Sequence, residues 1–124
     1  MSAVGGPAKV VFISLEGRPG GRSWNYAKLY NKLSEEEAIA TVADYTGIEL
    51  EKKDLDPKVQ DALYLFPVNR QLKVEFLARF PEFKGDPRVW SVGELVDKPD
   101  DVRQDYRKLV SAVFEKVKKS LTTP

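Results

Sequence analysis

Short apolar runs alternate along this sequence with longer segments of helical periodicity, and this order constrains the fold more than any other feature. The runs at residues 9–14, 62–66 and 88–92 are rich in aliphatic and aromatic side chains. Such runs are typical of strands buried on both faces, and strands separated by helices pair in parallel. We therefore predict an α/β fold, a small three-layer α/β/α sandwich with a parallel sheet of three strands. A fourth strand is possible at the edge if Ile48–Glu51 pairs there.

Helices are predicted where apolar residues recur at helical spacing. Ser34 and Glu37 have the spacing of a capping box, which predicts that a new helix begins there and ends near Gly47. Asn69 is the expected N-cap of a later helix. The four predicted helices are residues 24–33, 34–47, 69–80 and about 99–120.

The length of 124 residues fits a single domain over residues 1–124, with a flexible glycine-rich N-terminus over residues 1–8. No apolar run approaches the roughly 18 residues of a membrane span, and the start has no signal-peptide pattern. We therefore expect a cytoplasmic protein that does not contact a membrane. One Met, three Asn, three Gln and no Cys resemble the composition of proteins from thermophiles.

The charged residues do not form the pattern of a nucleic-acid-binding surface. Twenty Lys and Arg balance nineteen Asp and Glu, and the two signs are interspersed. The clearest basic cluster, at residues 116–119, lies near the end of the last predicted helix, where positive charge is favourable anyway. We therefore do not expect nucleic acid to be a partner.

A glycine-rich loop follows the first predicted strand and precedes the first predicted helix. In parallel α/β folds, ligands bind at the carboxyl ends of strands, and backbone amides at a helix N-terminus attract anions. The arginines of this loop can add charge-assisted hydrogen bonds to phosphate oxygens. The alternative is a surface turn with solvated arginines. The residues predicted to bind an anion are Gly17, Arg18, Gly20, Gly21, Arg22 and Ser23.

The chain contains neither cysteine nor histidine. Without them it lacks the usual thiolate nucleophile, the commonest general base and the commonest zinc ligands. The acidic groups at residues 35–37 and 54–56 are explained by a helix cap and a turn. We therefore predict that the chain is not an enzyme and holds no metal and no cofactor.

The strand, the loop ending in Arg22-Ser23 and the helix after it resemble the low-molecular-weight protein tyrosine phosphatases. In that family a cysteine, five residues, an arginine and a serine or threonine form the phosphate-binding loop. Counting back from Arg22 places Glu16 where the cysteine is expected. If the loop carries two extra residues, the counterpart is Ser14 instead.

The second half of the chain is similar to the same family. Phe80-Pro81 matches the end of a family helix, and Tyr106-Arg107 matches a pair near the start of the last helix. Asp97 lies nine residues before Tyr106, where the family carries its general acid, so the resemblance implies that Ser14, Glu16 and Asp97 are relics. It also implies a shortened sheet, because residues 34–50 resemble the segment that follows the family's second strand.

Two functions remain open at this point. In the first, the chain is a non-catalytic phosphatase-like domain whose loop binds phosphate, sulfate or the phosphorylated group of a partner. In the second, it is a protein-interaction module, an accessory subunit or assembly regulator, that uses an α/β scaffold without a ligand site.

Overall fold

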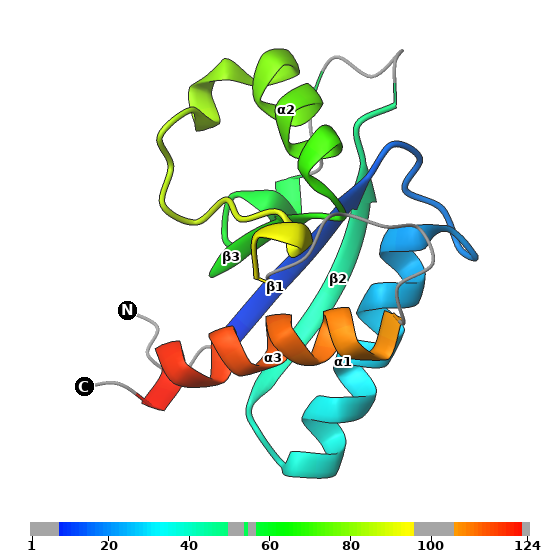
Figure 1. The fold of residues 1–124 in the computed structure, drawn as a ribbon, viewed down its shortest axis with the longest axis vertical. Coiled ribbons are helices and arrows are strands. Elements are labelled where there is room, and N and C mark those ends of the chain that lie inside the picture. The colour runs from blue at the N-terminus through cyan, green and yellow to red at the C-terminus, as the bar shows by residue number, and fades with distance from the viewer. Residues whose placement is uncertain (1–7, 50–53, 55–56, 96–105, 123–124) are drawn as a thin grey trace.

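The structure is a computed structural model that describes residues 8–49, 54, 57–95 and 106–122. Its main elements, in chain order, are three strands and three α-helices, joined in places by short 3-10 turns (Figure 1). The strands are β1 (Ala8–Ser14), β2 (Thr41–Gly47) and β3 (Tyr64–Pro67). The α-helices are α1 (Arg22–Glu37), α2 (Arg70–Arg79) and α3 (Tyr106–Thr122). The 3-10 turns are η1 (Pro57–Val59), η2 (Pro81–Phe83) and η3 (Val92–Leu95).

The three strands form one parallel sheet in the order β2-β1-β3, which confirms the predicted α/β class. The central strand β1 is buried on both faces, since Val10, Val11, Phe12 and Ile13 have no exposed surface. Its last residue, Ser14, pairs in register with Gly47, the last residue of β2. The carboxyl ends of these two strands therefore lie side by side.

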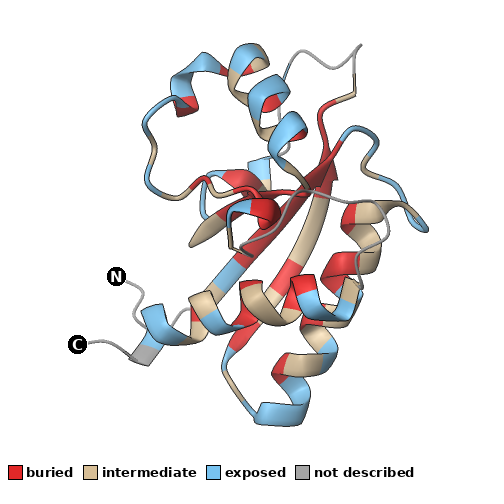
Figure 2. Cartoon of the chain, in the orientation of Figure 1, coloured by how far each residue is buried: buried red, intermediate tan, exposed pale blue. Residues whose placement is uncertain are grey.

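Helices α1 and α3 pack together over one face of the sheet. The ring of Phe12 in β1 meets Tyr26 and Tyr30 of α1, with centroid separations of 5.6 and 6.0 Å. Tyr30 in turn meets Phe114 of α3 at 5.5 Å. Helix α2 contacts β3. Figure 2 shows that the buried residues gather in the sheet and on parts of the helices that cover it. The aromatic contacts of Phe12 with Tyr26 and Tyr30 fix α1, and with it the loop before α1, against β1.

The predicted helix over residues 34–47 is wrong. Helix α1 continues to Glu37 and ends at Ala38, which has a left-handed backbone (φ 53°), and Thr41–Gly47 form β2. The Ser34 hydroxyl does not cap a helix N-terminus but donates to the carbonyl oxygens of Ile39 and Thr41, at 2.8 and 2.6 Å. The β-branched residues of this segment were the signal for a strand. A strand therefore follows α1, where the sequence analysis expected a second helix.

The predicted strand over residues 88–92 is also wrong, because only Val89 forms a bridge, to Leu65 of β3. A turn held by the Asp86–Arg88 ion pair precedes Val89, and η3 begins at Val92, so the bridge does not extend into a longer ladder. Ile48 and Glu49 are not in a strand, and Leu50 and Glu51 lie outside the described residues.

The other predicted strands and helices agree with the structure within a few residues wherever it describes them. Asn69 caps α2 as predicted, since its side chain accepts a hydrogen bond from the Leu72 amide at 2.7 Å. The N-terminal segment 1–7 and most of the residues before α3, 96–105, lie outside the described part of the chain. Within the described part, no helix has both the length and the apolar character that crossing a membrane requires.

We expect Tyr30 to make the fold sensitive to alkaline pH. Burial raises the pKa of the Tyr30 hydroxyl to about 12, and the hydrogen bond to Thr41 at 2.8 Å only partly offsets this. Between pH 10 and 12 the unfolded state loses this proton first, so the free energy of unfolding falls as pH rises, by up to roughly 2–3 kcal/mol. Urea unfolding measures this change: between about pH 8 and about pH 11, the free energy of unfolding should fall less in Tyr30→Phe than in the wild type. An equal loss in both proteins would contradict the prediction.

Candidate functional site

The candidate site is built at the carboxyl end of β1, where the chain leaves the sheet and turns into α1. The loop passes close to the end of β2, because Gly17 packs directly against Gly47. A Cβ on Gly47 would lie 2.8 Å from the Glu16 carbonyl carbon and 2.9 Å from the Gly17 Cα. Gly20 has a φ of +89°, a conformation that glycine adopts without strain. Two glycines are therefore required by close approach and a third by backbone geometry.

Ser14 and Ser23 join the two ends of the loop. Their hydroxyl oxygens are 2.7 Å apart and both residues are buried. The Ser14 hydroxyl also donates to the Glu16 carbonyl at 2.8 Å, and the Ser23 hydroxyl donates to the Thr46 carbonyl at 3.4 Å, so the two serines form one hydrogen-bonded cluster. Ser14 thus lies beneath the loop, whereas the Glu16 side chain is exposed and pairs with Arg18 at 2.8 Å. Of the two expected counterparts of the family's cysteine, only Ser14 lies at the base of the loop.

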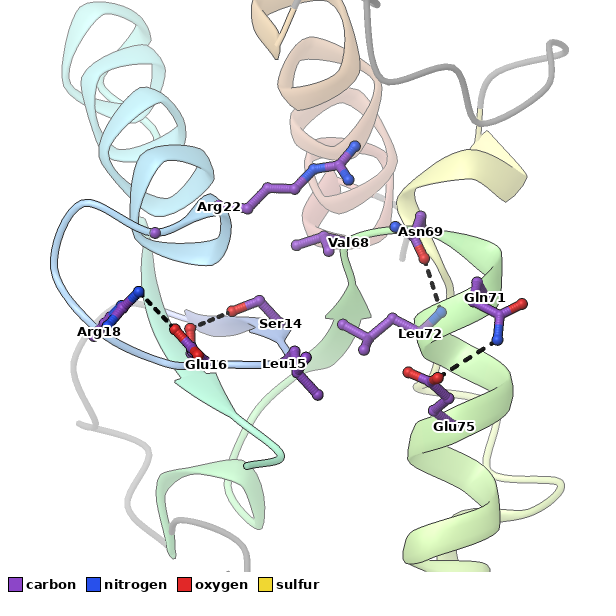
Figure 3. A pocket seen from close by; sticks show the side chains of 11 residues that line it. Ser14, Leu15, Glu16, Arg18, Arg22, Val68, Asn69, Gln71, Leu72 and Glu75 are labelled. Carbon is purple, nitrogen blue, oxygen red and sulfur yellow. Dashed lines mark hydrogen bonds and ion pairs between the residues drawn. The ribbon is translucent and has the colours of Figure 1, made fainter. Parts of the chain in front are cut away.

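Arg22 is the first residue of α1 and is partly exposed. Its Nε donates to the Tyr26 hydroxyl at 3.2 Å, and its guanidinium carbon lies 5.7 and 5.8 Å from the ring centroids of Tyr26 and Tyr106. Figure 3 shows the side chain reaching from the start of α1 toward Val68. The guanidinium is therefore held beside the loop rather than extended into solvent.

The N-terminus of α1 has a strongly positive character. No side chain caps it, and its first turn contains no acidic residue that would offset the positive end of the helix dipole. The Gly21 amide donates to the Arg18 carbonyl at 3.0 Å, so Gly21 closes a turn instead of offering its N–H. The Asn25 side chain donates to the Gly21 carbonyl at 2.9 Å and fixes the loop against the helix. The first amides of α1 remain the donors available for an anion.

A pocket of about 420 Å³ opens between this loop and α2 (Figure 3). Of the six residues predicted to bind an anion, Arg18, Gly21 and Arg22 line it, while Ser23 is buried under Ser14. Asp97 lies outside the described residues. The opposite wall was not predicted and comes from Val68, Asn69, Gln71, Leu72 and Glu75.

The sequence did contain a signal for this second wall. Asn69 is the second residue after β3, which pairs in parallel with β1. Since the carboxyl ends of parallel strands meet at one edge of a sheet, residues after β3 should lie beside the loop after β1. Among the described residues, no group of three acidic side chains is arranged to hold a metal ion.

The same fold occurs in solved structures of phosphatases. The YwlE arginine phosphatase, as a cysteine-to-serine mutant with a phosphorylated active site serine, is 13% identical with a TM-score of 0.70, over 90% of this chain and 96% of its own. A low molecular weight protein tyrosine phosphatase from Bacillus subtilis is 13% identical with a TM-score of 0.64, and the match covers 91% of this chain and 99% of that protein. Another such phosphatase, from T. tengcongensis, is 14% identical with a TM-score of 0.62, and the match covers 92% of this chain and 97% of that protein.

The chain therefore has a phosphatase-like α/β fold. More particularly, its fold is that of the low-molecular-weight protein tyrosine phosphatases, as the resemblance of its loop and helices implied. No protein-family model matches the sequence, and no match to a curated protein is found.

These structures contradict the prediction that the chain is not an enzyme, since the proteins that share its fold are phosphatases. That prediction rested on the absence of cysteine and histidine. The absence removes particular side chains, but the end of β1 still presents a hydroxyl, Ser14, beneath the loop. The absence of two residue types was therefore too weak a basis for the prediction that the chain is not an enzyme.

Proposed function

We propose that this chain is a phosphatase-like domain that binds the phosphate group of a phosphorylated ligand in the loop between β1 and α1. The observation that carries the proposal is the placement of Arg22 at an uncapped helix N-terminus that lines a pocket. Arginine at the start of a helix is electrostatically unfavourable on its own, because it adds positive charge to the positive end of the dipole. A bound dianion removes that penalty and is attracted by both groups.

Each part of the loop has a distinct role in this proposal. The two terminal nitrogens of Arg22 hydrogen-bond two phosphate oxygens, as the fork of a guanidinium allows. Amides in the first turn of α1 bind a further oxygen. Arg18, whose side chain is 72% exposed and paired with Glu16, adds long-range attraction at the rim. Gly17, Gly20 and Gly21 shape the backbone, and Ser23 supports Ser14 from below.

The test is a phosphate and sulfate titration followed through the amide resonances of labelled protein. We expect saturable shifts in residues 17–23 and in the first turn of α1. Titration with chloride at matched ionic strength is the control, since a general salt effect moves resonances all over the surface. A flat titration at millimolar phosphate would contradict phosphate binding and would favour a protein-interaction module.

A second candidate function is phosphoryl transfer to Ser14. It is favoured by the buried Ser14 hydroxyl at the base of the pocket, and by the similar arginine phosphatase structure that carries a phosphorylated active site serine. With an aryl phosphate as donor, a bond forms between phosphorus and the Ser14 Oγ while the bond from phosphorus to the aryl oxygen breaks. The Ser14 proton ends on the released phenol.

Incubation with para-nitrophenyl phosphate should then release nitrophenol and increase the intact mass by one phosphoryl group. The Ser23 hydroxyl, 2.7 Å from the Ser14 hydroxyl, holds the Ser14 oxygen in place for this attack. We expect Ser14→Ala to abolish the mass increase while phosphate binding is retained. A mass increase that persists in Ser14→Ala would place the acceptor elsewhere, and no increase in the wild type would leave binding as the function.

A further inference from the structure

Tyr26 places a buried hydroxyl directly behind the arginine of the candidate site. The residue lies one helical turn after Arg22 in α1 and has no exposed surface. Its hydroxyl oxygen accepts a hydrogen bond from the Arg22 Nε at 3.2 Å. No residue of the loop itself makes a side-chain hydrogen bond to the Arg22 guanidinium within the described part of the structure.

The Tyr26 ring is held firmly in place. It packs edge-on against Phe12 of the central strand, with centroids 5.6 Å apart, and edge-on against Tyr106 of α3 at 4.9 Å. The guanidinium of Arg22 lies at nearly the same distance from the two tyrosine rings, 5.7 and 5.8 Å. The hydroxyl therefore belongs to the core of the protein rather than to the loop.

This contact decides which donors Arg22 offers to an anion. A guanidinium has five N–H donors in a fixed planar fork. When the Nε hydrogen bonds to Tyr26, the side chain is restricted in rotation and the two terminal nitrogens remain for phosphate. Ordering a long side chain before the ligand arrives lowers the entropy lost on binding.

We propose that Tyr26 is a positioning residue that holds the Arg22 guanidinium in its phosphate-binding orientation through this hydrogen bond. The inference rests on the proposed function, because it assigns a role to Arg22 in binding phosphate. Tyr26 does not touch the ligand. Its effect on affinity passes through Arg22.

The tests are the substitution Tyr26→Phe and a matched control on the same helix. Tyr26→Phe keeps the ring between Phe12 and Tyr106 and removes only the hydroxyl. Tyr30→Phe removes an equally buried hydroxyl from α1, but that hydroxyl bonds to Thr41, away from the loop. We expect Tyr26→Phe to weaken inorganic phosphate binding about five- to tenfold, the scale of ordering one flexible side chain, and Tyr30→Phe to leave it within about twofold.

A double-mutant cycle distinguishes positioning from a general structural role. Lysine has no Nε–H that can be held while a fork binds phosphate, so in an Arg22→Lys background Tyr26→Phe should have no further effect on affinity. If Tyr26→Phe lowers phosphate affinity equally in the wild type and in Arg22→Lys, the tyrosine does not act through Arg22 and the inference is overturned. Tighter phosphate binding by Tyr26→Phe would also overturn it, because the hydroxyl would then be competing with the anion.

A second measurement does not depend on phosphate. The Arg22 Nε–H should exchange slowly with water in the wild type and in Tyr30→Phe, and at least about tenfold faster in Tyr26→Phe. Fast exchange in the wild type would overturn the positioning role whatever phosphate does. Slow exchange together with a flat phosphate titration would contradict only the proposed function.

Discussion

Replacing Gly47 with alanine is expected to destabilise the protein on the order of 3 kcal/mol or more, the upper range for forcing an extra carbon into packed structure. The atoms that a Cβ would meet at Gly47 all belong to the backbone of Glu16 and Gly17. Backbone cannot rotate away as a flexible side chain can, so the loop or the end of β2 must move. Gly17→Ala meets the backbone of Thr46 and Gly47 and should cost a similar amount. Urea unfolding monitored by tryptophan fluorescence measures both changes.

Gly20→Ala and Gly85→Ala are matched controls for this effect. Both positions have a positive φ, of 89° and 80°, but a Cβ at either would meet no atom within 4 Å. Each should cost only about 1 kcal/mol, from backbone strain. A Gly47→Ala protein as stable as these controls would show that the loop does not lie against β2.

Arg22→Ala is expected to weaken phosphate binding by about 100-fold. The substitution removes a charge and a pair of charge-assisted hydrogen bonds, together worth about 2–3 kcal/mol. The fold should remain, because Arg22 is partly exposed and the core beneath it is formed by Tyr26 and Phe12. Isothermal titration with phosphate measures the loss, and circular dichroism checks that the protein is folded.

Arg18→Ala is the matched control for Arg22→Ala. It removes the same charge from the same loop, but Arg18 is exposed and already paired with Glu16. We expect a loss of about twofold at physiological salt, since exposed charges are strongly screened. Equal losses for the two arginines would indicate diffuse electrostatic attraction rather than a built phosphate site.

The elements flanking the loop could be predicted because their signals are local. The run of buried residues in β1 and the cap at Asn69 depend on neighbours within a few positions. The prediction that Ser34 and Glu37 begin a new helix was wrong, because both residues lie inside α1. The spacing of a capping box can also occur within a helix, so this local pattern did not locate a helix start. Only the packing of the last turn of α1 directs the Ser34 hydroxyl toward Ile39 and Thr41.

The candidate site could be predicted only in part. The glycines and arginines of the loop mark where an anion could bind, but three of the six predicted residues do not line the pocket. The wall formed by α2 lies about fifty residues away in the chain, counting from Arg22 to Leu72. No local pattern connects two such segments. Their proximity follows from the pairing of β1 with β3.

The sequence by itself determined the α/β class, the strand-loop-helix order and the position of Arg22 in the loop before the first helix. Those features follow from propensities and spacing over short distances. Tertiary structure alone decided that Ser14 rather than Glu16 lies under the loop, that Gly47 is needed by Gly17, and that the Tyr26 ring packs against Phe12 and Tyr106. Each of these depends on strand register and on helix packing against the sheet, which bring together residues that the chain keeps apart.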